Sequence, residues 1–355
     1  MSDGVAVHVA AAAGSVRVRE LQPADFQRWD EFVSACPEAT FFHRAGWRTV
    51  IERAFGHRTT FLYAEADGRI EGILPLAEVR SILFGHALVS LPFCVYGGIA
   101  AASERARLAL DEAAGEQAET LGVDHLEYRS LTAHHPEWAH TDLYVTFRKA
   151  IDPDVERNLN EIPRKQRAMV RKGIKAGLKG EVDEGVERFF SAYAQSVHRL
   201  GTPVFSKRYF QILREVFGSD CDVLTVTLDG ALVASVMSFY FRDEVLPYYA
   251  GGTEQARDVA GNDFMYWDLM RRACERGIRI FDYGRSKRGT GSFDFKKNWG
   301  FEPQPLNYEY RLVKGKRVPE LNPLNPKYRL AIKLWQRLPL PLANRIGPLI
   351  ARSLG

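Results

Sequence analysis

Cationic side chains and glycines are concentrated in one stretch of the chain, FDYGRSKRGTGSFDFKKNWGF, from Phe281 to Phe301. Glycine lets a backbone adopt positive φ and approach a ligand closely, so that N–H groups and neighbouring cations can surround an anion. The pattern predicts a cradle for a polar, anionic ligand, although a plain glycine turn accounts for the glycines equally well. The expected cradle consists of Arg285, Ser286, Lys287 and Arg288, beside Gly284, Gly289 and Gly291.

Groups that could exchange a proton lie next to this cradle. Asp282 is the carboxylate at the end of the strand expected before it, and could act as a base, as an orienting group or as the structural partner of an arginine. Tyr248, Tyr249 and Tyr283 could line an acceptor groove or donate a proton. Aromatic residues at strand spacing more often belong to a core, so both interpretations stay open.

A second concentration of positive charge lies between Arg164 and Lys179, where seven basic residues occur without an acidic one. On a helix over 163–179 they would cover an arc of about 160°. Such a face attracts phosphate groups, whereas a solvated helix surface is the alternative. The residues expected to face a ligand are Arg164, Arg167, Arg171 and Lys172.

The segment FFHRAGW, near the N-terminus, offers two further candidates. His43 and Trp47 could contact substrate at the start of a helix, although a lone histidine is more often a capped or solvated side chain.

The elements that must position these residues follow the same order twice. Two runs with alternating apolar residues surround Asp67-Gly68 and Asp229-Gly230, a pair that favours a type I′ hairpin turn. Each is followed by a strand-like segment ending in two glycines (LPFCVYGG and LPYYAGG), a helix-length stretch with a glycine C-cap, and a further strand (LGVDHLEYRS and RGIRIFDYGRS). We interpret this order as an internal duplication of an α/β (α+β) unit with a mixed sheet, the alternative being chance similarity.

Composition is consistent with two domains of ordinary size, because the chain has 355 residues, of which 46% are hydrophobic. The four cysteines form no C-x-x-C pair, so we expect buried thiols in a reducing compartment, without a disulfide framework or a metal site. No signal peptide and no membrane-spanning run is recognisable, which favours a cytoplasmic location. The net charge of +4 is modest, so the placement of charge carries more information than its sum.

The repeated unit resembles the core of the GCN5-related N-acetyltransferase (GNAT) fold in VLPYYAGG, in the helix that ends at Glu275 and in IRIFDYG. Two such units joined by a basic helix resemble the Fem family of aminoacyl transferases, through RKQRAMVRKGIKAGL, LDGALVASVMSFYF, GNDFMYWDLMRRACERGIRIFDYGRS and FDFKKNWGF. Over nearly its full length the chain is similar to the Fem-related branch associated with exosortase and PEP-CTERM systems in exopolysaccharide-producing bacteria.

This resemblance implies two tandem GNAT-like domains and transfer of an aminoacyl or other acyl group to an amine or hydroxyl of an envelope or exopolysaccharide precursor. It makes Lys296 the first choice for a functional residue, stabilising an oxyanion or holding a substrate phosphate, with a surface lysine as the alternative. Lys297 and Trp299 belong to the same motif, and Trp299 is expected to pack beneath Lys296.

The acyl donor stays undecided between aminoacyl-tRNA, held through its backbone phosphates, and acyl-CoA. The stretch ARDVAGNDF keeps Arg257 and Gly261 but lacks the spacing and second glycine of a pyrophosphate loop, which speaks against coenzyme A. No cofactor is expected to be bound permanently. Without a G-x-S-x-G elbow or a catalytic cysteine, direct transfer is favoured over a covalent enzyme intermediate. An acyl-CoA-dependent N- or O-acetyltransferase and a non-catalytic glycolipid- or polysaccharide-binding protein are the alternatives.

We expect a disordered segment over 1–14, domains over 15–155 and 156–315, and an amphipathic tail over 316–355. From Leu321 onward the tail has six basic residues and no acidic one. A helix over 328–338 would separate a basic side from an apolar side. Through 327–338 it could lie on an anionic membrane at the inner face of the cytoplasmic membrane, or dock on the protein itself.

Overall fold

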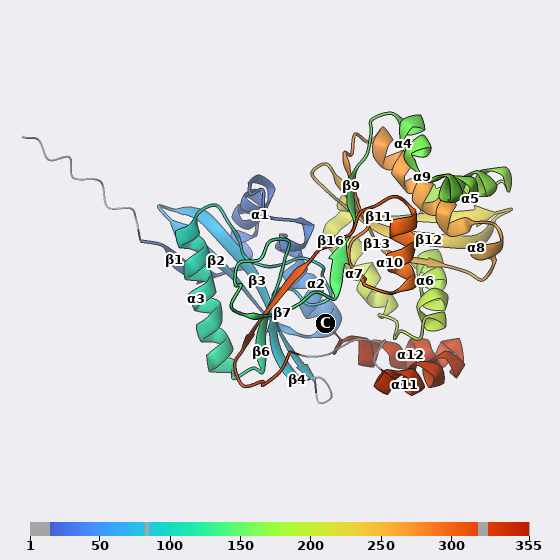
Figure 1. The fold of residues 1–355 in the computed structure, drawn as a ribbon. Coiled ribbons are helices and arrows are strands. Elements are labelled where there is room, and N and C mark those ends of the chain that lie inside the picture. Colours follow the sequence, from blue (N-terminus) through green and yellow to red (C-terminus); the bar gives the residue numbers. More distant parts are fainter. Residues whose placement is uncertain (1–14, 82–84, 319–325, 355) are drawn as a thin grey trace, which may run out of the picture.

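The computed structural model describes residues 15–81, 85–318 and 326–354 (Figure 1), so the segment expected over 1–14 lies outside the described residues. The helices are α1 Phe26–Ala35, α2 Gly46–Phe55, α3 Glu104–Leu121, α4 Val155–Glu161, α5 Arg164–Lys175, α6 Glu187–Arg199, α7 Lys207–Phe217, α8 Gln255–Asp258, α9 Gly261–Glu275, α10 Gly291–Asn298, α11 Pro326–Arg337 and α12 Leu340–Ala351, with short 3₁₀ turns at Pro23–Asp25, Phe41–His43 and Gly218–Asp220. The strands are β1 Arg17–Glu20, β2 Arg58–Ala66, β3 Arg69–Ser81, β4 Gly85–Val89, β5 Ala100–Ala101, β6 His125–Ser130, β7 Ala139–Thr141, β8 Tyr144–Thr146, β9 Arg148–Ala150, β10 Lys179–Val182, β11 Cys221–Leu228, β12 Ala231–Phe241, β13 Glu244–Gly252, β14 Ile280–Asp282, β15 Ser286–Lys287, β16 Gln304–Pro305 and β17 Asn307–Leu312.

Two mixed sheets form the two halves of the molecule. The first has the order β1-β2-β3-β4-β6-β17-β7 with β5 on β3, the second has the order β10-β11-β12-β13-β14-β9, and β15-β8-β16 form a small third sheet. Within each large sheet one pair is parallel, β4 with β6 and β13 with β14. The expected α/β class with two mixed sheets is confirmed.

Local sequence signals explain the matching parts of the two halves. Asp67 and Gly68 have φ of 49° and 74°, and Asp229 and Gly230 have φ of 50° and 81°. These are the two successive left-handed residues of a type I′ turn, so both predicted hairpins are present. The long helices α3 and α9 then cross their sheets, as expected for a duplicated unit.

Each half nevertheless completes the sheet of the other. Strand β17 pairs with β6 from Asn307 to Leu312, so a segment late in the chain belongs to the first sheet. Strand β9 pairs with β14, so Arg148–Ala150 belongs to the second. The two sheets therefore do not coincide with the expected domains 15–155 and 156–315, because each sheet contains one strand from the sequence range of the other domain.

One strand expected in the first half is absent. The segment LPFCVYGG forms an irregular buried stretch, in which Leu91 and Phe93 have φ of 66° and 68°. The N–H groups of Gly97 and Gly98 both donate to the Arg129 carbonyl at 3.0 Å, so the stretch folds back onto β6. At Gly97, a Cβ atom would stand 2.4 Å from the Ser90 carbonyl oxygen, which explains the need for glycine there. Its counterpart LPYYAGG is part of β13 as expected.

A continuous aromatic core joins the halves. Phe41 stacks on Phe239 with ring centroids 4.5 Å apart, and Phe42 contacts Tyr248 at 5.0 Å.

All four cysteines are buried, as expected. Helix α5 is shorter than the expected 163–179, because the chain turns at Gly177 with φ of 82° and Lys179 begins β10. Within the described residues, no helix has the length and apolar content needed to cross a bilayer.

Candidate functional site

The central strands of the second sheet separate where the candidate site lies. Strands β13 and β14 pair over Glu244–Ile280 and Val245–Phe281, and in the described part of the chain no further pair joins them. On its other side β13 carries a bulge, because Met237 opposes Tyr249 and Ser238 opposes Pro247, leaving Tyr248 as the additional residue. A ligand could therefore approach backbone between the diverging strands.

Lys296 closes this region from α10. Its Nζ donates to the carbonyls of Tyr283 at 2.7 Å, Gly284 at 2.9 Å and Arg285 at 3.1 Å. The side chain is 9% exposed, so Lys296 is not a surface lysine. Burial lowers its pKa to about 7, while Asp282 and the three carbonyl acceptors favour the charged form. An ammonium with three donors is fully used by these carbonyls, so Lys296 fixes the turn that follows β14.

Asp282 is fully buried, and both of its oxygens are occupied. Oδ1 accepts from the N–H of Gly284 at 2.7 Å and from Thr146, while Oδ2 accepts from the Tyr96 hydroxyl at 2.9 Å and lies 3.3 Å from Arg148 Nε. Burial raises the pKa of Asp282 and the cation of Arg148 opposes this shift. Because three hydrogen bonds and the Arg148 cation already surround this fully buried carboxylate, its position supports the orienting role and argues against a role as base.

Arg285 follows directly and is exposed, unlike its neighbours. Its guanidinium lies 4.8 Å from the ring centroid of Tyr144 and donates to the Tyr308 hydroxyl at 3.2 Å. Lys287 lies 5.5 Å from the same Tyr144 ring, and burial together with Arg285 lowers the pKa of Lys287 to about 8. This pair of cations on an aromatic floor can bind an anionic group.

The remaining members of the predicted cradle contribute less directly. Arg288 is exposed, and its Nε donates to the Asp142 carbonyl. Ser286 is buried and bonds to Ser292. Lys297 is exposed on α10, whereas Trp299 is buried and donates to Asp263 at 3.0 Å, which ties α10 to the first turn of α9.

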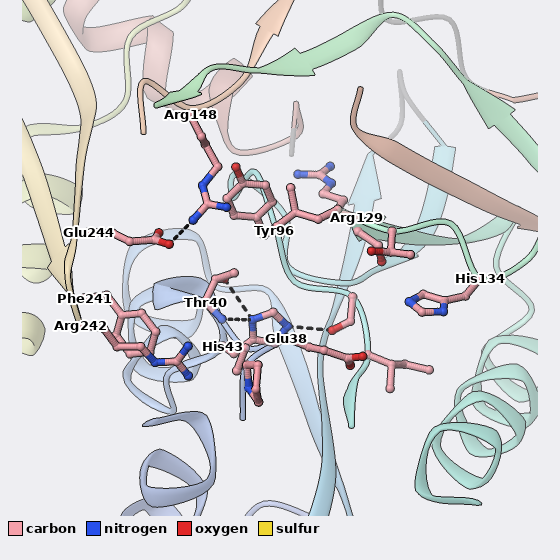
Figure 2. A pocket seen from close by; sticks show the side chains of 17 residues that line it. Glu38, Thr40, His43, Tyr96, Arg129, His134, Arg148, Phe241, Arg242 and Glu244 are labelled. Atoms are coloured by element: carbon pink, nitrogen blue, oxygen red, sulfur yellow. Dashed lines mark hydrogen bonds and ion pairs between the residues drawn. The ribbon is translucent and has the colours of Figure 1, made fainter. Parts of the chain in front are cut away.

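A pocket of about 300 Å³ is lined by residues of both halves, among them Tyr96 and Arg148, which contact Asp282 (Figure 2). Its walls include Tyr96, Arg148 and Glu244, with Arg148 and Glu244 paired across it. His43 lines the opposite wall, where Nδ1 accepts from the N–H of Thr40 and Nε2 donates to the Gly98 carbonyl at 2.8 Å. Burial lowers the pKa of His43 to about 4. It is therefore a neutral, fully bonded wall residue, so its position argues against proton transfer.

Three predicted contact residues lie in cores instead. Trp47 is fully buried and donates to the Phe41 carbonyl. The hydroxyl of Tyr249 pairs with that of Tyr209 at 2.8 Å inside the aromatic core, and Tyr283 packs against Phe301 and Tyr266 in the core of the second half. Burial raises the pKa of Tyr249 and of Tyr283 well above the usual value. Their surroundings argue against contact with substrate or proton transfer.

Tyr248 is half-buried beside Gly284, and its hydroxyl donates to the Phe93 carbonyl.

The basic helix α5 presents its charge to solvent. Arg164, Arg171 and Lys172 are exposed, and within the described residues no acidic side chain pairs with them. Arg167 is half-buried and donates to the Asn160 carbonyl at 2.7 Å. The helix begins next to α10, since Pro163 lies 3.2 Å from where a Cβ of Gly300 would be.

Sequence patterns did not reveal several residues that build the site. Tyr96, Thr146 and Arg148 surround Asp282, and Tyr144 and Tyr308 form the floor under Arg285. All five come from the irregular segment 90–98 and from strands β8, β9 and β17, and β9 and β17 reach the site through exchange between the halves. No local motif marks such positions.

Comparison with known proteins identifies the class to which this architecture belongs. Residues 162–297 match the family model described as an acetyltransferase (GNAT) domain. The fold of the chain is that of a tandem GNAT protein. It is similar to FemX, with 15% sequence identity and a TM-score of 0.67 over 89% of this chain and 100% of FemX.

Two further solved structures share the arrangement. L-PGS from Bacillus licheniformis has 14% identity and a TM-score of 0.55, covering 90% of this chain and 98% of its own. A tandem GNAT protein from the clavulanic acid biosynthesis pathway has 12% identity and a TM-score of 0.53, covering 86% and 100%. No curated protein sequence matches the chain. At these identities the likeness establishes the fold, and the chemistry must be argued from the site.

Proposed function

We propose that the protein is an acyltransferase whose chemistry takes place in the second half, where β13 and β14 separate. The observation that carries the proposal is Lys296, a buried cation tied to three successive carbonyls at this point of a GNAT domain. Burying an ammonium is costly unless it is paired or functional. The arrangement fixes the turn 283–285 and adds positive charge where an acyl oxyanion would develop.

In this proposal Arg285 binds the anionic part of the donor, and Lys296 acts as a positioning residue beneath it. The acceptor enters from the pocket lined by Tyr96, Arg148 and Glu244. Its amine or hydroxyl attacks the acyl carbonyl, the bond from the acyl carbon to the donor oxygen or sulfur breaks, and the acceptor proton leaves with the donor or with water. Transfer is direct. The four cysteines are buried, and burial raises the pKa of the Cys94 and Cys221 thiols, which disfavours a thiolate nucleophile.

Aminoacyl-tRNA is the donor that the charges favour. Helix α5, which carries exposed cations, begins near the C-terminal end of α10, so a phosphate backbone bound along α5 would place its end toward Lys296. The start of α9 is occupied instead by α8, and Ala256 lies 3.2 Å (Cα) from where a Cβ of Gly261 would be. That crowding disfavours a pyrophosphate at the helix N-terminus. Acyl-CoA remains the second candidate, because residues 162–297 match an acetyltransferase domain.

The acceptor in this proposal is a phosphate-bearing envelope or exopolysaccharide precursor. The chemistry of this acceptor follows from the resemblance to Fem enzymes, and the setting beside an exosortase and PEP-CTERM system follows only from the resemblance to the branch associated with those systems. A protein that binds such a glycolipid or polysaccharide without catalysis is the competing function.

A transfer assay tests the proposal. Purified full-length protein is incubated with radiolabelled aminoacyl-tRNA or with acyl-CoA, using an envelope-lipid extract from an exopolysaccharide-producing bacterium as acceptor. We expect label to move from aminoacyl-tRNA. Transfer from acyl-CoA alone would overturn the donor assignment, and binding of the extract without transfer from either donor would favour the non-catalytic function.

A further inference from the structure

The two C-terminal helices form a hairpin at the outer edge of the second half, beside α6 (Figure 1). One side of this hairpin packs on the protein. Ile332 lies 2.4 Å from where a Cβ of Gly201 would be, and Val204 lies 2.9 Å from the corresponding position of Gly347. Gln336 donates to the Arg199 carbonyl at 2.7 Å, and His57 Nε2 bonds to the Arg352 carbonyl at 2.7 Å. The inner side therefore packs on both halves.

The outer side retains large apolar side chains in solvent. In α11, Leu330 is 69% and Leu334 55% exposed, and in α12 Leu349 is 67% exposed. Among the described residues, the exposed large apolar side chains are concentrated at this end of the molecule. Besides those three they include Leu200, Leu342 and Leu354, while the rest are scattered over other elements. Scattered exposed leucines need no explanation, but a group on one face does.

Cations alternate with these leucines on the same faces. At 100° per residue, Lys333 and Arg337 fall within about 60° of Leu330 on α11, and Arg345 falls within about 60° of Leu342 on α12. All three cations are exposed, and no acidic residue occurs from Leu321 to Gly355. If a second protein chain bound this face, we would expect its carboxylates to pair with some of these cations. Leucines interleaved with cations, without an acidic residue, instead match a bilayer surface with anionic headgroups.

We propose that the outer face of the α11–α12 hairpin, defined by Leu330, Lys333, Leu334, Arg337, Leu342, Arg345 and Leu349, docks the protein on anionic lipid membranes. The leucines enter the boundary between headgroups and acyl chains, and the cations meet lipid phosphate. Because the inner side packs on both halves, docking would hold the whole molecule, including its pocket, at a fixed orientation to the membrane.

Co-sedimentation of the full-length protein with vesicles tests this proposal. The probes are vesicles of phosphatidylcholine alone and of phosphatidylcholine mixed with phosphatidylglycerol. We expect sedimentation with the mixed vesicles that weakens with salt. The combined variant Lys333→Gln, Arg337→Gln, Arg345→Gln should lose about fivefold in partitioning for each cation removed. The variant Leu330→Gln, Leu334→Gln, Leu349→Gln should lose about tenfold or more.

Two matched controls carry the same chemistry elsewhere. Leu108→Gln with Leu312→Gln changes exposed leucines of the first half, and Arg171→Gln with Lys172→Gln changes the charge of α5. Both should sediment as the wild type does, and thermal unfolding should confirm that every variant is folded. Loss of binding in the α5 variant with an unaffected hairpin variant would overturn the proposal. So would a hairpin variant that sediments normally, or one whose measured change is the loss of a dimer in light scattering.

Discussion

Arg129, near the end of β6, and Arg285, in the turn that follows β14, occupy similar places in the two halves. Both lie over the ring of Tyr308, at 5.4 Å and 5.8 Å from its centroid. Arg129 is 3% exposed, and its guanidinium is consumed by Glu127 at 2.7 Å and by the carbonyl of Cys94 at 2.9 Å. Arg285 is exposed, and its guanidinium contacts the tyrosines Tyr144 and Tyr308.

The difference arises from the segment that lies beside each arginine, which is 90–98 in the first half and the end of β13 in the second. In the first half, segment 90–98 folds onto β6 and fills the place where its strands would separate. In the second half the equivalent residues stay in β13, and the turn 283–285 is held from below by Lys296. The arginine of the first half is thus a buried structural residue, while the second half keeps an accessible cation beside the place where β13 and β14 separate.

Removal of the Lys296 ammonium should have the largest effect. Lys296→Met leaves three carbonyls without their donor and removes the positive charge, so we expect acyl transfer to fall about 100-fold or more. The neighbouring exposed Lys297→Met is the matched control and should retain most activity. Equal losses in the two variants would show that the comparison misplaces the site.

Neutralising Arg285 should sharpen the contrast with Arg129. Arg285→Gln removes a charged partner from the donor but leaves the fold intact, so we expect KM for the donor to rise about tenfold and kcat to change less. Arg288→Gln, on the same turn, should change KM little. An unchanged KM in Arg285→Gln would mean that the second arginine is as structural as the first.

The pH dependence of the free energy of unfolding should reveal the lowered pKa of the buried Lys296. Folding lowers the pKa of Lys296 from 10.5 to about 7, so between these values the unfolded chain binds more protons than the folded protein. Stability of the wild type should therefore rise with pH across this window by about 1 to 3 kcal/mol relative to Lys296→Met, which cannot titrate. Urea unfolding of both proteins at neutral and alkaline pH measures the difference. A constant difference would mean that the three carbonyls hold the proton on Lys296 throughout.

Two tyrosine hydroxyls join the halves and should differ in strength. Tyr96 donates to the buried carboxylate of Asp282, so Tyr96→Phe should lower the free energy of unfolding by about 2 kcal/mol. Tyr248 donates to the neutral Phe93 carbonyl, so Tyr248→Phe should cost about 1 kcal/mol. Denaturant unfolding gives both values, and a larger loss for Tyr248→Phe would contradict the assigned importance of the Asp282 cluster.

The sequence predicts those parts of the fold that depend on local chemistry. The Asp-Gly turns, the helix ends at Gly122 and Gly277 and the basic helix need no distant partner, and they are present. The exchange of β9 and β17 depends on which sheet edge is free after folding, which no local pattern encodes. The run LPFCVYGG is apolar enough for a strand, and nothing in its letters indicates that Leu91 and Phe93 would adopt positive φ.

The candidate site divides in the same way. Lys296 and the cation-rich turn are recognisable from sequence motifs. The hydrogen bonds of Lys296 to the turn 283–285, and those of Asp282 to Tyr96 and Thr146, depend on residues that are distant in sequence. Tyr249 and Trp47 lie in the core, and strand or helix spacing does not distinguish a core aromatic residue from one at a cleft.

A crystal structure with a non-reactive analogue of whichever donor supports transfer tests the central claim most directly. The account predicts that the acyl carbonyl lies between β13 and β14, next to the turn 283–285, with the anionic part of the donor on Arg285. An analogue bound against segment 90–98 of the first half, with Arg285 free of ligand, would contradict it.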